Sequence, residues 1–421
     1  MKKLLAFVLA SAMMLSLAAC GGGDNGGGGG GGKNSNTLTI FNTKSEIQAQ
    51  MEEMAKKYSA DKGVNVEVYY SNDTVAAHMA NKYAANDPYV LAMVDAKDIY
   101  SLGPEHAIDL SGEPWVANTT QAISIDGKVL GFPVCIEARG MMFNAEAISK
   151  YIGEFAPSDV RTLDGFKRVL ELLVANGMEA PVGIMKEDWS LAAHFMASFY
   201  EEHDDVQGFI DDLKAGKVDV NSDPQFSSLM DTFDVLKQYN YAASSPVAAE
   251  RETSEMKLAQ GDIAFMYGGN WDWAMIAEYD YTEGLGMMPV PQDDKGSNGG
   301  NTKMIGGGSK YFFIDNTASE ELQQAAKDFL NWLVNDAEGN KFLTEDCALV
   351  PAYSNISADN LDPLGASVKR YADSDSLIPS YNYMPDDHYA KLGAEMQKYL
   401  ANQCTRADLA SAIESYWASQ A

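Results

Sequence analysis

Cysteine and histidine are scarce in this sequence. Its 421 residues include four cysteines and five histidines. No C-x-x-C pair occurs, and the three cysteines besides Cys20 (Cys135, Cys347 and Cys404) cannot all pair with one another. These features argue against a disulfide framework, a redox centre or a zinc site. We therefore expect no metal and no cofactor, and we interpret the three cysteines as small apolar groups of the core.

Basic residues and catalytic motifs are also lacking. Lys and Arg number 31 against 60 Asp and Glu, which gives a net charge of −29. That charge repels nucleic acid and anionic lipid headgroups, so we expect no nucleic-acid partner. The patterns G-x-S-x-G and H-E-x-x-H are absent, and the glycine-rich stretch Gly306–Lys310 lacks the spacing of a phosphate-binding loop. We assign no catalytic residue.

Long apolar runs are missing beyond the N-terminus. Lys2 and Lys3 precede an apolar stretch, 4–17, that is typical of a secretion signal and too short to span a membrane comfortably. The stretch leads into Leu-Ala-Ala-Cys, which resembles the lipobox of bacterial lipoproteins. The resemblance implies that 1–20 is a lipoprotein signal peptide and that Cys20 carries lipid. An unmodified signal peptide with a chance cysteine is the alternative.

Glycine dominates the next segment, 21–36, which predicts a flexible tether that cannot form a core. Together with lipid at Cys20, this predicts an extracytoplasmic protein that is anchored to the cell membrane without spanning it. The remaining chain, 37–421, is long enough for two lobes.

Strand and helix patterns alternate in the first part of this region. Apolar runs at 38–42, 64–68 and 89–94 predict strands, and helical spacing at 45–58 and 74–85 separates them. This order predicts a parallel sheet covered by helices. The pattern resumes in a second region, with predicted helices at 162–175, 190–200, 227–239, 319–335, 338–344, 387–401 and 405–417 and predicted strands at 182–185, 263–267, 285–289 and 311–314.

The segment Asp126–Asn144 carries the strongest functional signal. Two apolar runs flank Glu137 and Arg139. Because Pro133 cannot donate to a strand ladder, we predict that the chain leaves one sheet and enters another near Val134. A charged pair at such a crossing is expected at the cleft of a two-lobed binding protein, and an ordinary strand that ends in solvent is the alternative.

Tryptophans next to polar residues form a second signal. Trp271 and Trp273 stand beside Asn270 and Asp272, directly after a predicted buried strand. Flat aromatic rings stack on the C–H faces of sugars, while carboxylates and amides bond the hydroxyl groups. We predict Trp271 as a ligand contact and Trp273 as a second candidate, although either ring could instead pack in the core.

The same pairing of an acid with an aromatic ring occurs in Asp188 and Trp189, after the predicted strand 182–185, so both are further cleft candidates. The remaining tryptophans are expected to be structural: Trp115, Trp332 and Trp417.

With these motifs, the chain resembles the extracytoplasmic solute-binding lipoproteins of sugar ABC transporters, the family 1 or maltose-binding-protein-like class. The resemblance runs from Leu38 to about Leu349 and more weakly to the end. Its clearest parts are DGKVLGFPVCIEARGMMFN, LAQGDIAFMYGGNWDW, GMMPVPQ, and GGGSKYFFI with the following KDFLNWLV.

The resemblance implies an α/β, two-lobed periplasmic-binding-protein-like fold of type II, in which discontinuous lobes are joined by a hinge and each lobe is a sheet covered by helices. Further crossings are predicted near Gly306 and Val350. The predicted lobes are 37–134 with 307–350, and 135–306 with 351–421.

In maltose-binding relatives a Glu of the crossing strand contacts sugar and a Trp after the glycine turn stacks on it. These roles fall here on Glu137 and Trp271, and an acid after the third strand corresponds to Asp95. The sequence departs from the maltose pattern around Lys44 and Glu46. The complete predicted ligand-binding set is Asn42, Lys44, Glu46, Asp95, Glu137, Arg139, Asp188, Trp189, Asn270, Trp271, Asp272 and Trp273.

The predicted function is capture of a sugar, in particular an oligosaccharide, and its delivery to an ABC importer permease by a monomeric protein. Two alternatives remain. The same fold could bind a polyamine, a peptide or a similar solute, or the protein could be a surface glycoside hydrolase that uses Glu137 with Asp95 or Asp188.

Overall fold

The computed structural model describes residues 37–293, 301–357 and 359–421. The predicted signal peptide, the lipidation site at Cys20 and the glycine-rich tether lie outside these residues. Within the described residues, no helix has the length and apolar character needed to cross a membrane.

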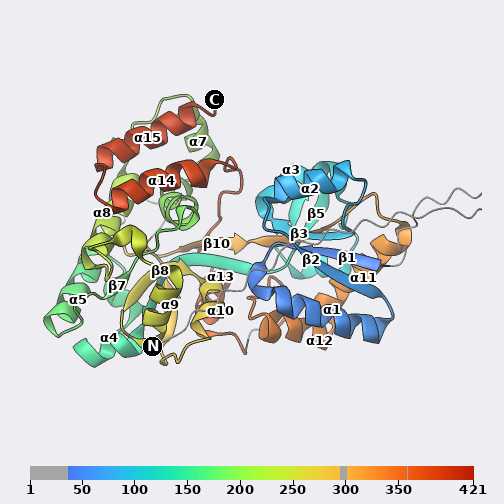
Figure 1. Cartoon of the computed structure of the whole chain (residues 1–421), viewed down its shortest axis with the longest axis horizontal. Coiled ribbons are helices and arrows are strands. Elements are labelled where there is room, and N and C mark those ends of the chain that lie inside the picture. The colour runs from blue at the N-terminus through green and yellow to red at the C-terminus, as the bar shows by residue number, and fades with distance from the viewer. Residues whose placement is uncertain (1–36, 294–300, 358) are drawn as a thin grey trace, which may run out of the picture. The chain divides into compact units, whose positions relative to one another are not determined.

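The first sheet has six strands in the order β2-β1-β3-β11-β5-β4 (Figure 1). Strand β1 pairs in parallel with β2 and β3, as the strand–helix alternation predicted, whereas β11 runs antiparallel to β3 and β5. The strands are β1 (Thr37–Asn42), β2 (Asn65–Tyr70), β3 (Leu91–Asp95), β4 (Ile123–Ile125), β5 (Lys128–Pro133) and β11 (Lys310–Ile314).

Helices cover both faces of this sheet. Along β3, Leu91 and Met93 join one hydrophobic cluster, while Ala92 and Val94 join another, because successive side chains of a strand point to opposite faces. Figure 1 shows α2 and α3 on one side of the strands and α1, α11 and α12 on the other. The helices are α1 (Gln48–Lys62), α2 (Val75–Ala84), α3 (Ala96–His106), α11 (Glu320–Asn335) and α12 (Ala337–Lys341).

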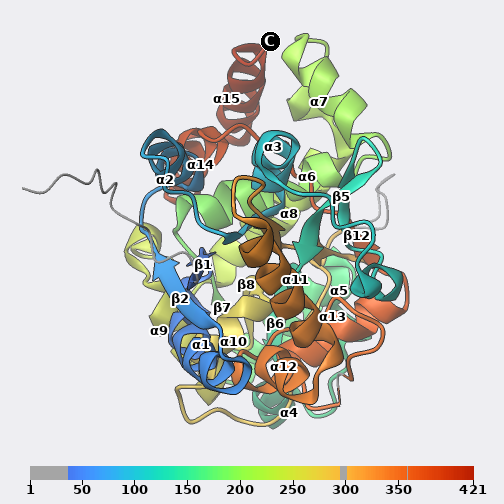
Figure 2. The same cartoon turned by 90° about the vertical axis from the view of Figure 1, so that its right-hand side faces the viewer.

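The second sheet has the order β12-β10-β6-β8-β7, and β9 also pairs with β6. The strands are β6 (Ile136–Asn144), β7 (Val182–Gly183), β8 (Phe265–Gly269), β9 (Leu285–Met288), β10 (Met304–Gly308) and β12 (Leu377–Ile378). Helix α15 packs beside α7 (Figures 1 and 2). Helix α14 packs on the π-helix η4. The helices of this part are α4 (Ala145–Ile152), α5 (Leu163–Ala175), η4 (Trp189–Met196), α6 (Ser198–Glu201), α7 (Val206–Lys214), α8 (Pro224–Tyr239), α9 (Arg251–Gln260), α10 (Trp273–Ile276), α13 (Pro363–Asp373), α14 (His388–Leu400) and α15 (Arg406–Ala418).

Most predicted helices occur within a few residues of their predicted bounds. Thr162 caps α5 by accepting a hydrogen bond from the backbone N–H of Gly165, as its position indicated. The sequence did not predict α3, whose last turns contain the helix-breaking residues Gly103 and Pro104. The predicted helix 190–200 is instead a π-helix followed by one short α-helical turn.

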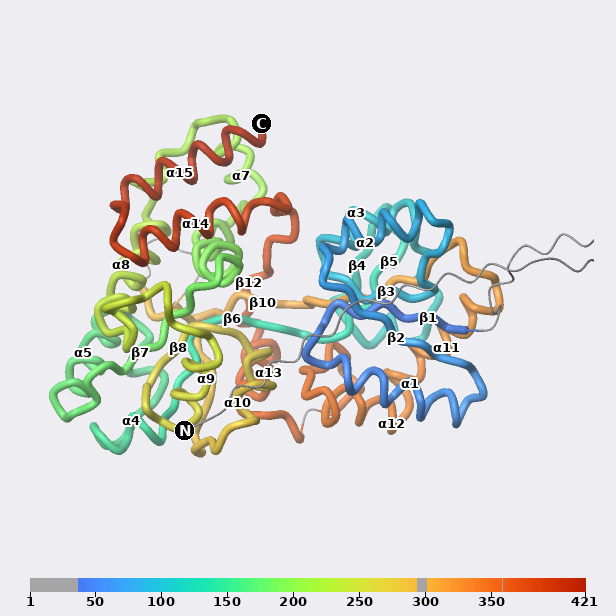
Figure 3. The backbone as a smooth tube through the Cα atoms, in the orientation of Figure 1, coloured from blue at the N-terminus to red at the C-terminus, as the bar shows by residue number. Residues whose placement is uncertain are grey.

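The chain passes between the two sheets in short links. Val134 and Cys135 join β5 to β6, and Ser309 joins β10 to β11 (Figure 3). The backbone N–H of Ser309 donates to the carbonyl of Cys135 at 3.3 Å, so the two links are bonded to each other. Pro133 thus ends a strand of the first sheet, as predicted. The glycine triplet, near which the second crossing was predicted, ends β10 and precedes β11.

A third stretch, which contains Val350 and Tyr353, lies beside these links. The backbone N–H of Ile136 donates to the carbonyl of Val350 at 2.9 Å, close to the predicted third crossing. The Tyr353 hydroxyl donates to the carbonyl of Pro133, which ties the same stretch to the end of β5.

The structural tryptophans and the cysteines lie largely where the sequence placed them. Trp115 and Trp417 are fully buried. Trp332 is partly exposed and packs against the hydrophobic cluster that contains Leu91 and Met93, which we call the first core. The thiols of Cys135 and Cys347 are buried and free, while Cys404 is free but half-buried.

Gly140 allows β6 and β9 to lie close together, and this contact can be tested. A Cβ at position 140 would stand 2.3 Å from the backbone oxygen of Met288. We expect Gly140→Ala to lower the free energy of unfolding by about 1–3 kcal/mol through overpacking. Thermal and urea unfolding measure this loss. Gly112→Ala is the control because no atom lies within 4 Å of its added Cβ, and equal stability of both variants would contradict the packing described.

Candidate ligand-binding cleft

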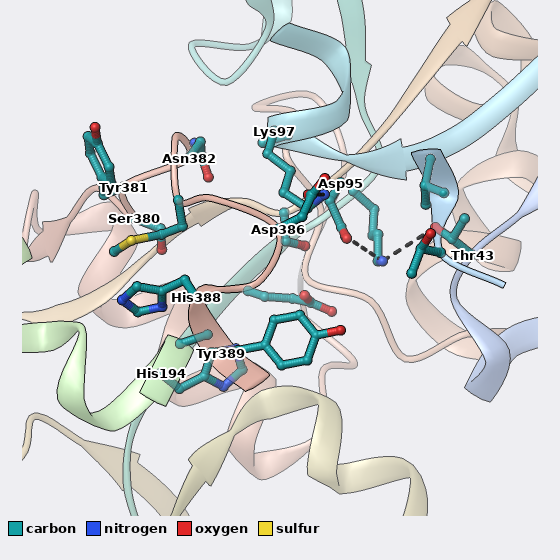
Figure 4. Close-up of a pocket in the computed structure, with 18 of the residues that line it drawn as sticks. Thr43, Asp95, Lys97, His194, Ser380, Tyr381, Asn382, Asp386, His388 and Tyr389 are labelled. Atoms are coloured by element: carbon teal, nitrogen blue, oxygen red, sulfur yellow. Dashed lines mark hydrogen bonds and ion pairs between the residues drawn. The ribbon is translucent and has the colours of Figure 1, made fainter. Parts of the chain in front are cut away.

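A cavity of about 600 Å³ is lined by residues of both sheets and of the links between them. In Figure 4, Thr43 and Asp95 at the end of the first sheet lie across from Ser380 and Tyr381 of the segment before α14. We call this cavity the cleft. Its size falls within the range of about 300–1,000 Å³ that is usual for small-molecule sites.

Glu137 lines the cleft at the start of β6 and is held by a buried lysine. The Lys44 Nζ lies 2.5 Å from a carboxylate oxygen of Glu137 and 2.6 Å from one of Glu46. Burial opposes ionisation of Glu137, yet the charge and hydrogen bond of Lys44 lower its pKa below the ordinary value. Burial also opposes the charge of Lys44, but the two carboxylates raise its pKa. The loop after β1 is therefore fixed to the crossing strand.

Asp95, at the end of β3, is held in a similar way. The Lys310 Nζ lies 2.5 Å from a carboxylate oxygen of Asp95 and also reaches Thr43 at 3.3 Å. Burial raises the pKa of Asp95, but the charge and hydrogen bond of Lys310, aided by Lys97, lower it overall. Both carboxylates that the resemblance placed at the ligand site are thus held ionised by lysines.

Two further ion pairs complete the cleft wall. The Lys97 Nζ lies 3.2 Å from a carboxylate oxygen of Asp386, which joins the start of α3 to the segment before α14. Arg139 pairs with Glu201, whose other oxygen accepts the backbone N–H of Tyr381 at 2.9 Å. That segment is therefore fixed to β6 through Glu201.

Trp271 lines the cleft from the short helix η7 (Asn270–Asp272) that follows β8. Its ring lies over the backbone of Gly269, where a Cβ would stand 2.2 Å from the Trp271 Cη2. Asp272 accepts the backbone N–H of Gly269 and three hydrogen bonds from the guanidinium of Arg251. The glycine turn and this ion pair together fix the position of the indole.

The structure brings four of the twelve predicted residues to the cleft surface, namely Asp95, Glu137, Arg139 and Trp271. The other eight are outside its lining. Lys44 holds Glu137 by an ion pair, and Asp272, next to Trp271 in the chain, pairs with Arg251. The Asn270 Oδ1 accepts the backbone N–H of Ala138. Asn42 is fully buried and bonds the backbone of its own loop, so it shapes the loop that carries Lys44.

The remaining predicted residues occupy other positions. Trp273 packs on the first core and Trp189 stacks on Arg251, with the ring centroid 4.9 Å from the guanidinium carbon. Asp188 caps the π-helix by accepting the backbone N–H of Trp189. Glu46 bonds the Lys44 ammonium. Direct ligand contact by these residues remains a prediction.

Several cleft residues were not predicted from the sequence. The stretch from the end of β2 to the start of α2 gives residues 70–76, and η4 gives Ala193 and His194. The segment before α14 gives residues 380–382 and 384–386. A sequence signal existed for the last group, because Tyr381-Asn382 combines an aromatic and an amide side chain. Figure 4 shows His194 and Tyr389 among the residues that line the cleft.

No group of three or more His, Cys, Asp or Glu side chains in the described ranges could hold a metal ion. The cleft offers ion-paired carboxylates, amide and hydroxyl groups, and aromatic rings. This set suits a ligand that is recognised by hydrogen bonds and ring stacking.

The pair between Lys44 and Glu137 predicts a pH-dependent loss of stability. Because the pKa of Glu137 is lower in the folded chain than in the unfolded chain, its ionisation stabilises the fold above the unfolded value of about 4.3. That contribution disappears as the pH falls through the folded value. We expect Glu137→Gln to cost up to about 3 kcal/mol at pH 7 and less at pH 3.5, which lies below the unfolded pKa.

Urea unfolding at both pH values measures this difference. Lys57→Gln removes a lysine that pairs with Glu53 on the exposed surface and serves as the control, since exposed pairs contribute little. A cost for Glu137→Gln that is the same at both pH values would contradict the proposed origin of the stability.

Comparison with known proteins agrees with this geometry. Residues 53–373, most of the chain, match the family described as bacterial extracellular solute-binding protein. No curated protein matches the sequence. Among solved structures, RafE from Streptococcus pneumoniae is similar with a TM-score of 0.73 and 17% identity, over 92% of this chain and 99% of that one. A further solved structure is that of RafE in complex with raffinose.

Two other solved structures show the same fold. A sugar transporter from Bacillus licheniformis in complex with stachyose has a TM-score of 0.67 and 20% identity, over 91% of this chain and all of that one. A chitin oligosaccharide binding protein has a TM-score of 0.70 and 17% identity, over 91% of this chain and 98% of that one. With the two helix-covered sheets and the family match over most of its length, the chain belongs to the bacterial extracellular solute-binding proteins.

Proposed function

We propose that this protein captures a neutral oligosaccharide in the cleft and delivers it to the permease of an ABC importer. The observation that carries the proposal is the combination of an indole face, Trp271, with charged groups that already have partners inside the protein. The solved structures with bound raffinose and stachyose support this choice of ligand class.

The charges of the cleft favour a neutral ligand over a polyamine. Four of the five carboxylates that line it are paired with a cation: Asp95, Glu137, Glu201 and Asp386. Only Asp73, exposed at the rim, has no ion-pair partner among the described residues. A cationic ligand would have to compete with lysines and an arginine for these oxygens, whereas sugar hydroxyls can bond them without separating the pairs.

The lysine pairs of Glu137 and Asp95 argue against a glycoside hydrolase that uses these two carboxyl groups. Hydrolysis needs one carboxylic acid with a raised pKa to protonate the leaving group. The pKa values of Glu137 and Asp95 are both lowered, by Lys44 and Lys310 after the opposing effect of burial. Neither carboxyl group is therefore suited to act as the general acid.

For the mechanism, we propose that the lobes 37–134 with 307–350 and 135–306 with 351–421 rotate about the crossing links. Ligand binds the closed arrangement better and shifts the population toward it. The permease would recognise both lobes of the monomeric, closed protein. Signal-peptide cleavage and lipid on Cys20 would keep the protein at the outer face of the cell membrane.

Removal of the indole of Trp271 tests the proposal. We expect at least one of raffinose, stachyose, maltotriose and chitotriose to bind the wild type without being degraded. We also expect Trp271→Ala to weaken that binding by about 1–3 kcal/mol, because the stacking area is lost. Isothermal titration measures the affinities, and a reducing-sugar assay measures degradation.

Tyr281→Ala is the matched control, because Tyr281 is an exposed aromatic residue outside the cleft lining. Unchanged affinity in Trp271→Ala would show that the ring is not a ligand contact. New reducing ends in the wild-type sample would instead support the hydrolase alternative.

Lipid anchoring is tested separately by Cys20→Ala. The wild-type chain expressed in a bacterial host should partition into the detergent phase of a Triton X-114 extract and incorporate labelled palmitate. The variant should do neither, because the acceptor thiol is missing. Palmitate labelling of Cys20→Ala equal to that of wild type would contradict the anchor.

A further inference from the structure

We propose that His194 is a specificity-determining residue of the cleft, which bonds a hydroxyl group of the sugar that stacks on Trp271. This inference rests on the proposed function and extends it to a residue that the sequence did not indicate. His194 lines the cleft, and its ring centroid lies 5.0 Å from that of Trp271, at an interplanar angle of 54°.

The backbone presents His194 in an unusual way. It lies in the π-helix η4, and π-helical turns occur often at functional sites because the wider turn shifts side chains relative to a regular helix. Trp189 starts this π-helix, and its ring meets that of His194 edge-on, at 5.1 Å and 78°. Trp189, which the sequence placed at the cleft, thus supports the imidazole from outside the lining.

One guanidinium fixes both rings. Arg251 bonds Asp272, which is next to Trp271, and also stacks on Trp189, which supports His194. The two rings at the cleft wall therefore share one rigid support. Such a support maintains the spacing that simultaneous stacking and hydrogen bonding to one sugar require.

The imidazole has hydrogen-bonding capacity that the protein does not use. Its Nδ1 is buried and has no partner among the described residues. The polar atom left to reach a ligand is Nε2, on the other edge of the ring. His388, also at the cleft, differs in this respect, because its Nε2 lies 3.5 Å from the Tyr200 hydroxyl in the core. An uncommitted ring nitrogen beside a stacking face is suited to a sugar hydroxyl.

The surroundings keep this ring uncharged. Burial lowers the pKa of His194 well below its ordinary value, and the cations of Arg139 and Arg251 lower it further. Nearby, Glu201 is committed to Arg139, and burial lowers the pKa of His388 to about 4. In a neutral imidazole, Nε2 either donates to or accepts from a hydroxyl group, depending on the tautomer, and the ring gives a carboxylate ligand no cation to bind.

Two substitutions separate hydrogen bonding from packing. We expect His194→Phe, which keeps a ring but has no polar atom, to bind the best sugar of the raffinose, stachyose, maltotriose and chitotriose panel about tenfold more weakly. His194→Gln, which can still bond a hydroxyl, should stay within about threefold of wild type. His106→Gln is the control, because that histidine packs on Tyr83 and is outside the cleft lining.

Equal sugar affinity of wild type and His194→Phe would overturn the assignment of His194 alone. Failure of the wild type to bind any panel sugar would overturn the proposed function and this inference with it. An independent readout is the side-chain NMR signal of His194, identified by its absence in His194→Gln. The ring should stay neutral from pH 8 to pH 5.5 and its signal should shift on addition of the bound sugar, whereas titration near pH 6.5 would contradict a ring held between two tryptophans.

Discussion

The ion pair between Lys44 and Glu137 is the interaction on which the rest of the cleft depends. It joins the loop after the first strand of one sheet to the first residues of the strand that enters the other sheet. A lysine ammonium this deeply buried requires a carboxylate partner, and the carboxylate requires the lysine to stay ionised in the same surroundings. The position of the cleft wall and its charge state are therefore set together.

A second ion pair has a corresponding role on the opposite wall. Arg251 holds Asp272 beneath Trp271 and stacks on Trp189, so charges outside the cavity orient the aromatic groups at its surface. Throughout the cleft, charged residues mostly bond one another, and neutral groups are left to meet a ligand. A site built in this way can enclose a sugar without leaving an unpaired charge behind when the sugar departs.

Much of the fold, and less of the site, could be predicted from the sequence. Pro133 and the glycine triplet marked both links between the sheets, because proline cannot donate to a strand ladder and glycine can take backbone shapes that other residues cannot, as at Gly307. The residues at cleft-forming ends of strands, such as Asp95 and Glu137, followed from the strand pattern and the resemblance. The π-helix that presents His194 leaves no local signature that differs from that of an ordinary helix, so Trp189 was assigned the position that His194 occupies. The segment before α14 is held at the cleft by contacts between residues far apart in the sequence. Tyr381 and Glu201, for example, are 180 positions apart, so no local pattern indicates their contact.

The central claim, that the charges of the cleft are satisfied within the protein and its ligand is neutral, is tested most directly by the salt dependence of binding. Calorimetric titrations with the sugar panel and with spermidine at 20 mM and 500 mM sodium chloride measure it. The account predicts that a neutral sugar binds with the same affinity at both salt concentrations and that spermidine does not bind in the cleft. Spermidine binding that weakens at high salt, with no binding of any neutral sugar, would contradict it.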